Sequence, residues 1–157
     1  MSKERPPHAD ETQAPFWFLG GRAQILVPGT ATGGALSVME FTDPKGHAPP
    51  LHVHEAEDEI WIVLDGKITF FVGDERHDLH AGAVAHGPRG VPHSYLVRSS
   101  DARMVVAFGP AGIEDWFAAN SSPISDVNDV PASFDIDATV ASAMAYRLRV
   151  AGPPPVA

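Results

Sequence analysis

The chain has 157 residues, a formal net charge of -9 at pH 7 and no cysteine. This length is typical of one domain that buries a core without disulfides. The lack of cysteine excludes thiolate metal sites, thiol nucleophiles and iron–sulfur clusters, and it fits a cytoplasmic location. An acidic surface repels phosphate groups and anionic lipid, and no apolar run reaches the roughly 18 residues of a membrane span, so neither nucleic acid nor a membrane is an expected partner.

The chain begins with a polar segment over residues 1–15, which contains Pro6 and Pro7 and has no apolar stretch. We expect a disordered arm here rather than a signal peptide.

Short runs rich in β-branched and aromatic residues follow, and each is predicted to be a strand. They are Phe16–Leu19, Arg22–Val27, Gly34–Phe41, Glu59–Leu64, Lys67–Val72, Tyr95–Val97 and Met104–Phe108. Clusters of Gly, Pro and Asp separate these runs at intervals of about 8–12 residues, which favours an all-β sandwich or barrel over βαβ units. Asp65-Gly66 predicts a two-residue hairpin, because both residues tolerate the positive φ of a type I′ turn. Gly73-Asp74 predicts the next turn.

After Pro110 the pattern predicts two short helices, Ile113–Asn120 and Asp137–Tyr146, with Asp137 as the cap of the second. The polar stretch between them contains two prolines and is interpreted as a linker. The predicted organisation is an arm over residues 1–15, a barrel over residues 16–120, and a C-terminal region over residues 121–157. In that last region a linker, a short helix and a proline-rich tail pack on or near the barrel.

Two segments contain residues suited to bind a metal. His52 and His54 are two residues apart, so on a strand both imidazoles point to one face. A continuous strand would place Glu59 on the opposite face; we therefore expect a turn over residues 55–58 that returns the Glu59 carboxylate to the imidazoles. Further along, a Gly/Pro-rich turn leads to His93, the fourth expected ligand. Three imidazoles and a carboxylate suit one divalent transition metal, namely Fe, Ni, Mn, Co, Cu or Zn.

The spacing of both segments resembles the two motifs of the cupin family. The segment Gly46–Gly66 has glycine, five residues, His-x-His, four residues, Glu, six residues and glycine. The segment Gly82–His93 has glycine, five residues, Pro-x-Gly, two residues and His. One position departs from the second motif, because Val97 stands where the family has asparagine.

Further stretches are similar to bacterial single-domain cupins of the quercetin 2,3-dioxygenase-like group. They are Phe16–Gly21, Pro49–His54, Asp58–Glu59, Pro88–His93, Gly109–Glu114 and Gly152–Pro154. The resemblance implies an all-β cupin double-stranded β-helix, a jelly-roll barrel, here with short C-terminal helices. It also implies a metal held by three histidines and a glutamate, and frequent dimerisation. For the best-known members it implies oxygen-dependent cleavage of a flavonol ring with release of carbon monoxide.

Three residues share strand parity with the ligands and are candidates to line a pocket: Trp61, Val63 and Tyr95. Packing in the barrel core is the alternative for all three. Trp17 and Phe18 are candidates to close the cavity or a dimer interface.

Other polar residues receive structural interpretations. Glu55, Glu57 and Asp58 are interpreted as a solvated acidic turn rather than as further ligands or bases. His86 is assigned a local hydrogen bond in preference to a contact with the ligands, and Arg89 a hydrogen bond within its turn in preference to anion binding. The remaining histidines are interpreted as surface residues; these are His8, His47, His77 and His80.

The sequence thus predicts a metal-dependent dioxygenase that acts on a flavonol-like or other enolic or phenolic aromatic substrate with O2. Glu59 is expected to be both ligand and base, and the metal a Lewis acid. One alternative is a non-oxidative cyclase or isomerase of aromatic polyketides, and another is a small-molecule-binding cupin without turnover. A homodimer is expected, since exposed sheet edges are commonly covered by a partner.

Overall fold

The computed structural model describes residues 13–126, 128–129 and 133–156. The predicted N-terminal arm lies outside the described residues except for residues 13–15. No helix in these ranges is long and apolar enough to cross a membrane.

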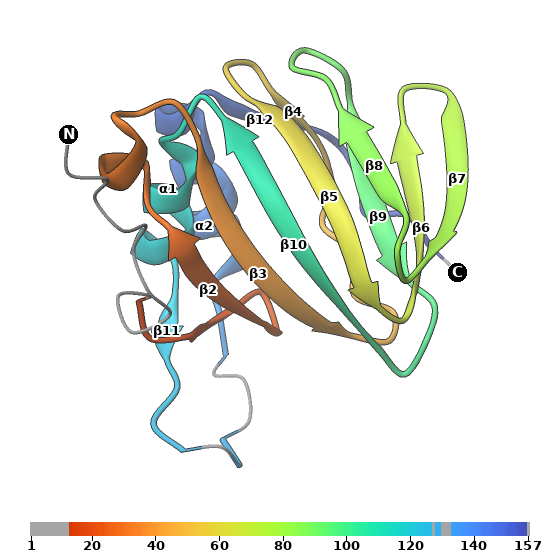
Figure 1. The fold of residues 1–157 in the computed structure, drawn as a ribbon, viewed down its shortest axis with the longest axis horizontal. Helices are drawn as coiled ribbons and strands as arrows, with labels where there is room; N and C mark the ends of the chain where they lie inside the picture. Colours follow the sequence, from red (N-terminus) through yellow and green to blue (C-terminus); the bar gives the residue numbers. More distant parts are fainter. Residues whose placement is uncertain (1–12, 127, 130–132, 157) are drawn as a thin grey trace, which may run out of the picture.

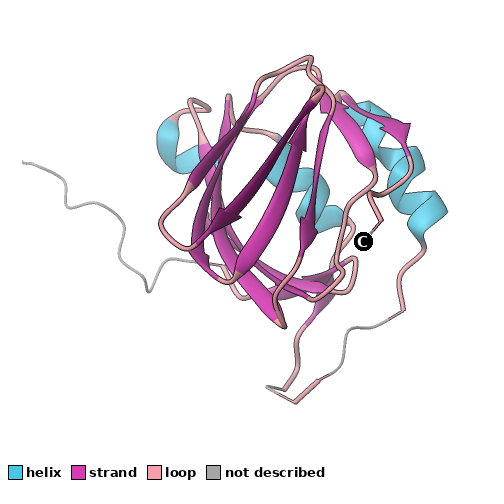
Figure 2. Ribbon diagram, turned by 90° about the vertical axis from the view of Figure 1, so that its right-hand side faces the viewer, coloured by secondary structure: helices cyan, strands magenta, loops and turns pink. Residues whose placement is uncertain are grey.

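Two antiparallel sheets make up most of the molecule (Figures 1 and 2). The first has the order β11-β1-β2-β3-β10-β5-β8 and the second the order β12-β4-β9-β6-β7. The strands of the first sheet are β1 (Phe16–Phe18), β2 (Gly21–Val27), β3 (Ser37–Pro44), β5 (Asp58–Asp65), β8 (Val84–Gly87), β10 (Asp101–Gly109) and β11 (Ser122–Pro123). Those of the second are β4 (Leu51–His54), β6 (Lys67–Val72), β7 (Glu75–His80), β9 (His93–Val97) and β12 (Leu148–Gly152). This is the predicted all-β jelly-roll class, although the two sheets do not close into one continuous barrel.

The helical segments are few and short. They are η2 (Gly29–Thr32), α1 (Ile113–Ala119), α2 (Ile136–Ala143) and η3 (Met144–Tyr146). Aromatic side chains of α1 anchor it on the first sheet: Phe117 packs edge-on against Phe18 and Phe41, with ring centroids 4.8 and 5.3 Å apart. The helices therefore lie at one end of the two packed sheets, near β1 to β3 (Figure 1).

Alternation of buried and exposed residues places the core between the sheets. On β10 every second residue from Ala102 to Phe108 is buried, and Met104 and Phe108 are fully buried. Full burial of side chains of this size contributes about 1.5–3 kcal/mol each. The apolar strands, rather than a ligand, thus supply the stability of the fold.

The path of the chain differs from the predicted hairpin at Asp65-Gly66. Strand β5 pairs with β10 and β8, whereas β6 pairs with β7 and β9, so the chain crosses from one sheet to the other at Gly66. A Cβ at Gly66 would lie 2.5 Å from the Asp101 carbonyl oxygen, so the glycine permits this close crossing. The prediction of a hairpin here was wrong, because turn chemistry marks a change of direction but not the pairing partner. The turn at Gly73-Asp74 is confirmed, since β6 and β7 pair up to Val72 and Glu75.

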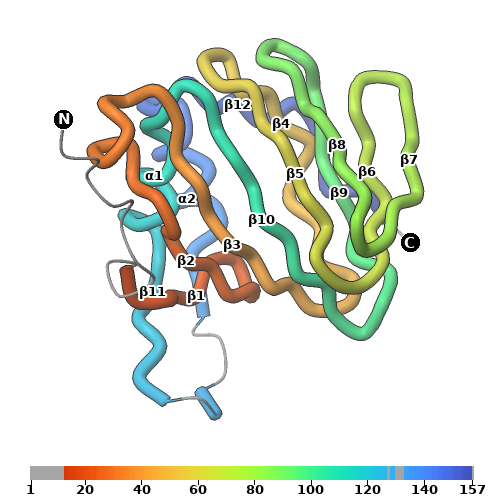
Figure 3. The backbone as a smooth tube through the Cα atoms, in the orientation of Figure 1, coloured from red at the N-terminus to blue at the C-terminus, as the bar shows by residue number. Residues whose placement is uncertain are grey.

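The C-terminal region enters both sheets. Strand β11, within the predicted linker, pairs with β1, and β12 lies beside β4 (Figure 3). The helix α2 begins after Asp135, whose extended backbone and side chain cap Ala138 N at 3.0 Å, so the expectation of Asp137 as the cap was wrong. Asp137 already lies in the first helical turn. The predicted division between a barrel over residues 16–120 and a C-terminal region over residues 121–157 remains a proposal, because strands of the C-terminal region pair with both sheets.

Candidate metal centre

Three strands from the two sheets bring four side chains to one point. His52 and His54 lie on β4, and His93 opens β9 directly opposite His52 in the ladder. Glu59 is the second residue of β5, in the facing sheet. One ligand atom from each of the four lies within 4.8 Å of the others. The turn before Glu59 thus has the effect expected from the sequence, with the carboxylate returned to the imidazoles.

Backbone carbonyls orient two of the imidazoles. Nδ1 of His52 lies 2.7 Å from the Pro50 carbonyl oxygen, and Nδ1 of His93 lies 3.0 Å from that of Val91. Because a carbonyl oxygen only accepts, each Nδ1 donates its hydrogen outward. Each Nε2 then faces inward, toward the cluster, as is usual for a metal-ligating histidine.

The third imidazole, that of His54, has carboxylates on both sides. Its Nε2 lies 3.1 Å from Glu59 Oε2 and its Nδ1 lies 3.4 Å from Glu57 Oε2. Nδ1 and Glu57 Oε2 are both buried without a well-formed hydrogen bond. Glu57 is 5% exposed, so its interpretation as part of a solvated turn was wrong. The Glu57 side chain lies beside the His54 ring, where a carboxylate can orient a ligating imidazole.

Glu59 Oε2 is the point on which the cluster converges, at 3.0 Å from His93 Nε2 as well as 3.1 Å from His54 Nε2. Burial opposes ionisation of Glu59, but the charge of His54 and hydrogen bonds from His54 and His93 outweigh it and hold its pKa well below the ordinary value.

Two histidines of the cluster, His52 and His54, have opposite pKa shifts. Burial and repulsion by His93 and His54 lower the pKa of His52 to about 3. Burial also disfavours charge on His54, yet Glu59 and Glu57 together raise its pKa to about 9. The cluster therefore attracts positive charge while it keeps His52 as the neutral imidazole that a metal requires. Three inward-facing nitrogens and a carboxylate fit a divalent transition metal.

The absence of a side chain at Gly87 on β8 allows the residues around the site to pack closely. Gly87 pairs with Glu59, and a Cβ in its place would lie 2.7 Å from Trp61 Cη2 and 3.1 Å from His93 Nδ1. Trp61 in turn packs edge-on against His93, with ring centroids 5.2 Å apart. A side chain at position 87 would therefore displace either the indole or the imidazole.

A largely apolar cavity adjoins three of the four residues, His52, His54 and Glu59, and is lined by residues of both sheets, α1 and α2. Trp61 and Tyr95 line this cavity, as does Phe18. Val63 is not among the described residues that line it, and it is buried in the hydrophobic core instead. Val63 therefore takes the packing role that was its alternative.

Two cavity residues, Asp43 and His47, were missed by the sequence reasoning. His47 was interpreted as a surface residue, but its side chain is only 11% exposed and it lines the cavity. Asp43 is fully buried. A signal for Asp43 existed in the alternation of β3, where Met39, Phe41 and Asp43 share one inward face.

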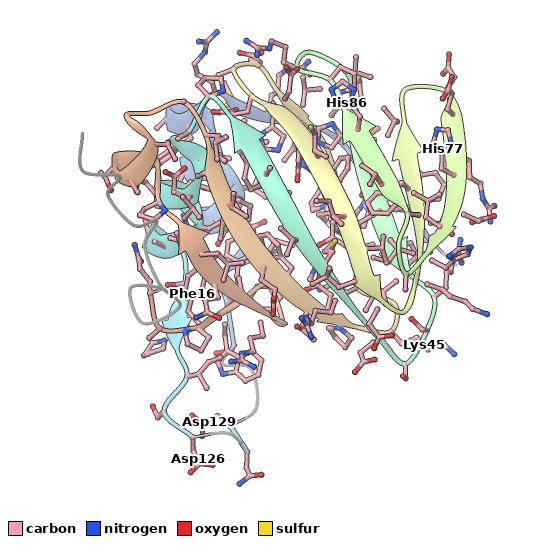
Figure 4. All side chains as sticks on the ribbon, viewed as in Figure 1. Phe16, Lys45, His77, His86, Asp126 and Asp129 are labelled. Carbon is pink, nitrogen blue, oxygen red and sulfur yellow. The ribbon has the colours of Figure 1, made fainter. Side chains whose placement is uncertain are left out.

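The remaining polar candidates lie on the outside. His86 is exposed on β8 with the neighbouring Gly87 facing inward, and Figure 4 shows His77 and His86 on the outer strands. Arg89 donates two side-chain hydrogen bonds and one backbone hydrogen bond to Asp58, and these bonds lower the pKa of Asp58 to about 2. Arg89 thus has a structural partner at the rim. His77 and His80 are exposed as predicted, and His8 lies outside the described residues.

Comparison with known proteins agrees with the motifs, the fold and the cluster. Residues 39–108 match the family model described as Cupin domain. The chain is 36% identical over 133 residues, 83% of its length, to quercetin 2,3-dioxygenase of Bacillus subtilis (strain 168), and it spans 40% of that protein.

Solved structures show the same fold. An RmlC-like cupin from Shewanella frigidimarina has a TM-score of 0.58 and 19% identity, over 71% of this chain and 96% of that one. Pac13, described as a unique nucleoside dehydratase, has a TM-score of 0.55 and 17% identity, over 69% of this chain and 83% of that one. At these identities the likeness concerns the fold alone.

The chain therefore belongs to the cupins. More particularly, it is a metal-dependent cupin similar to the bacterial quercetin 2,3-dioxygenase, and the His3Glu cluster implies a divalent metal.

Proposed function

We propose that this cupin is a dioxygenase that cleaves a flavonol-like or other enolic or phenolic aromatic substrate with O2. The observation that carries the proposal is the His3Glu cluster, three of whose residues line a cavity rich in aromatic side chains. The identity of 36% with a quercetin 2,3-dioxygenase supports the same reaction class.

The four clustered residues have distinct roles in this proposal. His52, His54 and His93 hold the metal through Nε2, and Glu59 is both ligand and base. When bound, the metal supplies a Lewis acid for an enolic or phenolic oxygen of the substrate. Glu59 lines the cavity, so its carboxylate is placed to accept the hydroxyl proton. The electron-rich enolate of the substrate is then reactive toward dioxygen.

The cavity wall provides the binding surface for a flat substrate. Trp61 and Trp116 contribute indole rings, and α2 contributes Ile136 and Val140. Aromatic and aliphatic walls bind planar rings through apolar contact and exclude water from the reacting atoms. The few polar groups of the cavity then fix the orientation of the ligand.

Oxygen consumption tests the proposal directly. The metal-loaded protein, given quercetin in a closed oxygen-electrode cell, is expected to consume O2 and release carbon monoxide into the headspace. The matched control is His93→Ala, which keeps the cavity but loses a ligand. Full metal occupancy without oxygen uptake would contradict the proposal; a rearranged product would then indicate a cyclase or isomerase, and unchanged ligand a binding protein.

We also propose a homodimer. The outer face of the first sheet exposes Ile60, Ile62, Leu64 and Val84, which are 39–59% exposed and adjacent on β5 and β8. Such an apolar stripe is typical of an interaction surface. Sedimentation at micromolar concentration would decide the oligomeric state, and a monomer would contradict the proposal.

A cytoplasmic location is proposed from the cysteine-free composition.

A further inference from the structure

A second polar cluster lies in the same cavity as the candidate metal centre and consists of Asp43, His47 and Tyr95. Tyr95 Oη donates a hydrogen bond to Asp43 Oδ2 at 2.7 Å. His47 Nε2 lies 3.8 Å from the same oxygen, and the His47 ring stacks on Tyr95 with centroids 6.0 Å apart. We call these three residues the Asp43 cluster.

Fold stability does not account for a carboxylate at this position. Asp43 is 1% exposed and follows Met39 and Phe41 on the inward face of β3. Burial raises its pKa, while His47 and Tyr95 oppose the shift. An apolar side chain would avoid this desolvation cost. The neighbouring strand even makes room for the carboxylate, since a Cβ at Gly21 would collide with Asp43 Oδ1.

The backbone holds His47 in place at the cavity. His47 N donates to the Pro44 carbonyl at 3.0 Å, and the His47 carbonyl accepts from Val97 N at 3.0 Å. Gly46 N also donates to the Val97 carbonyl at 3.0 Å. The loop between β3 and β4 is thereby fastened to the end of β9, the strand that carries Tyr95. A group held this way is preorganised for a ligand.

The Asp43 cluster is separated from the metal centre along the strands. On β10, Phe108 pairs with Glu59 and Ala102 pairs with Asp43, so the two acids lie six residues apart along this strand, or about 20 Å in backbone distance. Tyr95 bridges part of this gap, since it follows His93 on β9 by one same-face step of about 7 Å. The metal centre and the Asp43 cluster therefore occupy different levels of one largely apolar cavity.

We propose that the Asp43 cluster is a second recognition point that hydrogen-bonds a hydroxyl group of the substrate remote from the one at the metal centre. It then selects polyhydroxylated aromatic compounds over those with a single hydroxyl. Tyr95 donates to Asp43, so its phenolic oxygen is free to accept from such a hydroxyl. This inference rests on the proposed function, because it takes an aromatic substrate with one oxygen at the metal centre.

The test compares two ligands that share one ring system. Quercetin carries distal hydroxyls and 3-hydroxyflavone has none, and both are titrated into the metal-loaded protein without oxygen, with tryptophan fluorescence as readout. Tyr95→Phe is expected to weaken quercetin binding about tenfold, the effect of one lost hydrogen bond, and to leave 3-hydroxyflavone binding unchanged. Metal content should stay at the wild-type level. Tyr146→Phe is the matched control, since the other tyrosine does not line the cavity, and it should change neither affinity.

The inference would be overturned by either of the first two outcomes below, whereas the third would reject the proposed function instead. An equal loss for both ligands, or none, would leave the Asp43 cluster a structural link between the sheets. A wild-type protein that binds quercetin no more tightly than 3-hydroxyflavone would exclude the recognition point, whatever its oxygen uptake. Preference for quercetin that depends on Tyr95, without oxygen consumption in air, would instead reject the dioxygenase and leave the recognition point standing.

Discussion

The metal centre and the Asp43 cluster share one cavity but are assembled in different ways. Three of the four candidate ligands lie within eight positions of the sequence, on β4 and the start of β5, and only His93 comes from further away. The Asp43 cluster joins β3, a loop and β9 across both sheets, with 52 positions between Asp43 and Tyr95. Local spacing thus makes one site recognisable in the sequence, while strand register creates the other.

The difference teaches how chemistry is distributed in this fold. The metal centre needs close convergence of ligand atoms, which a two-residue strand repeat and a turn produce directly. Recognition of a distal group needs only a polar side chain at the right level of the cavity, which any inward-facing strand position can supply. Variants that affect one cluster and leave the other intact would establish that the two are separable.

The largest effect is expected from removal of a single ligand. His52→Ala, His54→Ala and His93→Ala should each lose most of the bound metal and all turnover, yet remain folded, because the apolar core supplies the stability. Elemental analysis and circular dichroism of the purified variants measure both quantities. Tyr95→Phe is the control from the Asp43 cluster and should keep its metal. Full occupancy in any two of the three variants would reject the ligand assignment.

The next largest effect concerns Glu59 as base. Glu59→Gln keeps the volume and one oxygen but removes the charge, so turnover at full metal occupancy should fall by about 10²–10⁴-fold. Turnover per bound metal is the measurement, and His86→Ala, on the outer side of β8, is the control. Near-normal turnover in the metal-loaded variant would leave Glu59 as a ligand only.

A smaller effect is expected at Gly87, where the fold makes space for the site. Gly87→Ala should destabilise the metal-free protein by about 1–3 kcal/mol, because the new methyl group presses on Trp61 and His93. Chemical denaturation measures the change. Gly109→Ala is the matched control, since its Cβ would meet only the Ala35 carbonyl at an ordinary 3.7 Å. Equal effects at both glycines would argue against the close packing at the site.

The last effect, similar in size to that at Gly87, is a pH dependence that belongs to the metal centre. The pKa of His54 is raised from its ordinary value of 6.5 to about 9, so its stabilising charge is fully present below about 6.5 and is lost as the pH rises through 9. The metal-free protein should therefore lose about 1–3 kcal/mol of stability between pH 6.5 and 9.5.

Metal should reverse this trend, because fewer protons compete for His54 as the pH rises and metal affinity then increases. Thermal unfolding with and without metal at each pH measures both slopes. The variant His54→Gln should flatten the slope of the metal-free protein, and an unchanged slope would assign the pH dependence to other groups.

Several local predictions failed for one common reason. Turn residues at Asp65-Gly66 marked a reversal, but the chain uses it to change sheets rather than to form a hairpin. The acidic turn was expected to be solvated, yet Glu57 is buried against His54. His47 was expected at the surface, yet its side chain lies 3.8 Å from Asp43, four residues earlier, and stacks on Tyr95 of β9. Glu57 and Asp43 lie only three and four positions from their partners, but the burial of these pairs is decided by packing against other strands, which local patterns do not specify.

The sequence by itself determined the all-β class, most of the strands, and the set of four candidate ligands with the turn that joins them. These features depend on side-chain alternation, glycine turns and short spacings, all of which act within a few residues. Only the tertiary structure decided the order of strands in the two sheets, the place of β12 beside β4, and the meeting of Asp43, His47 and Tyr95. Such contacts are set by register and by the packing of one sheet on the other, where the free energy depends on residues far apart in the chain.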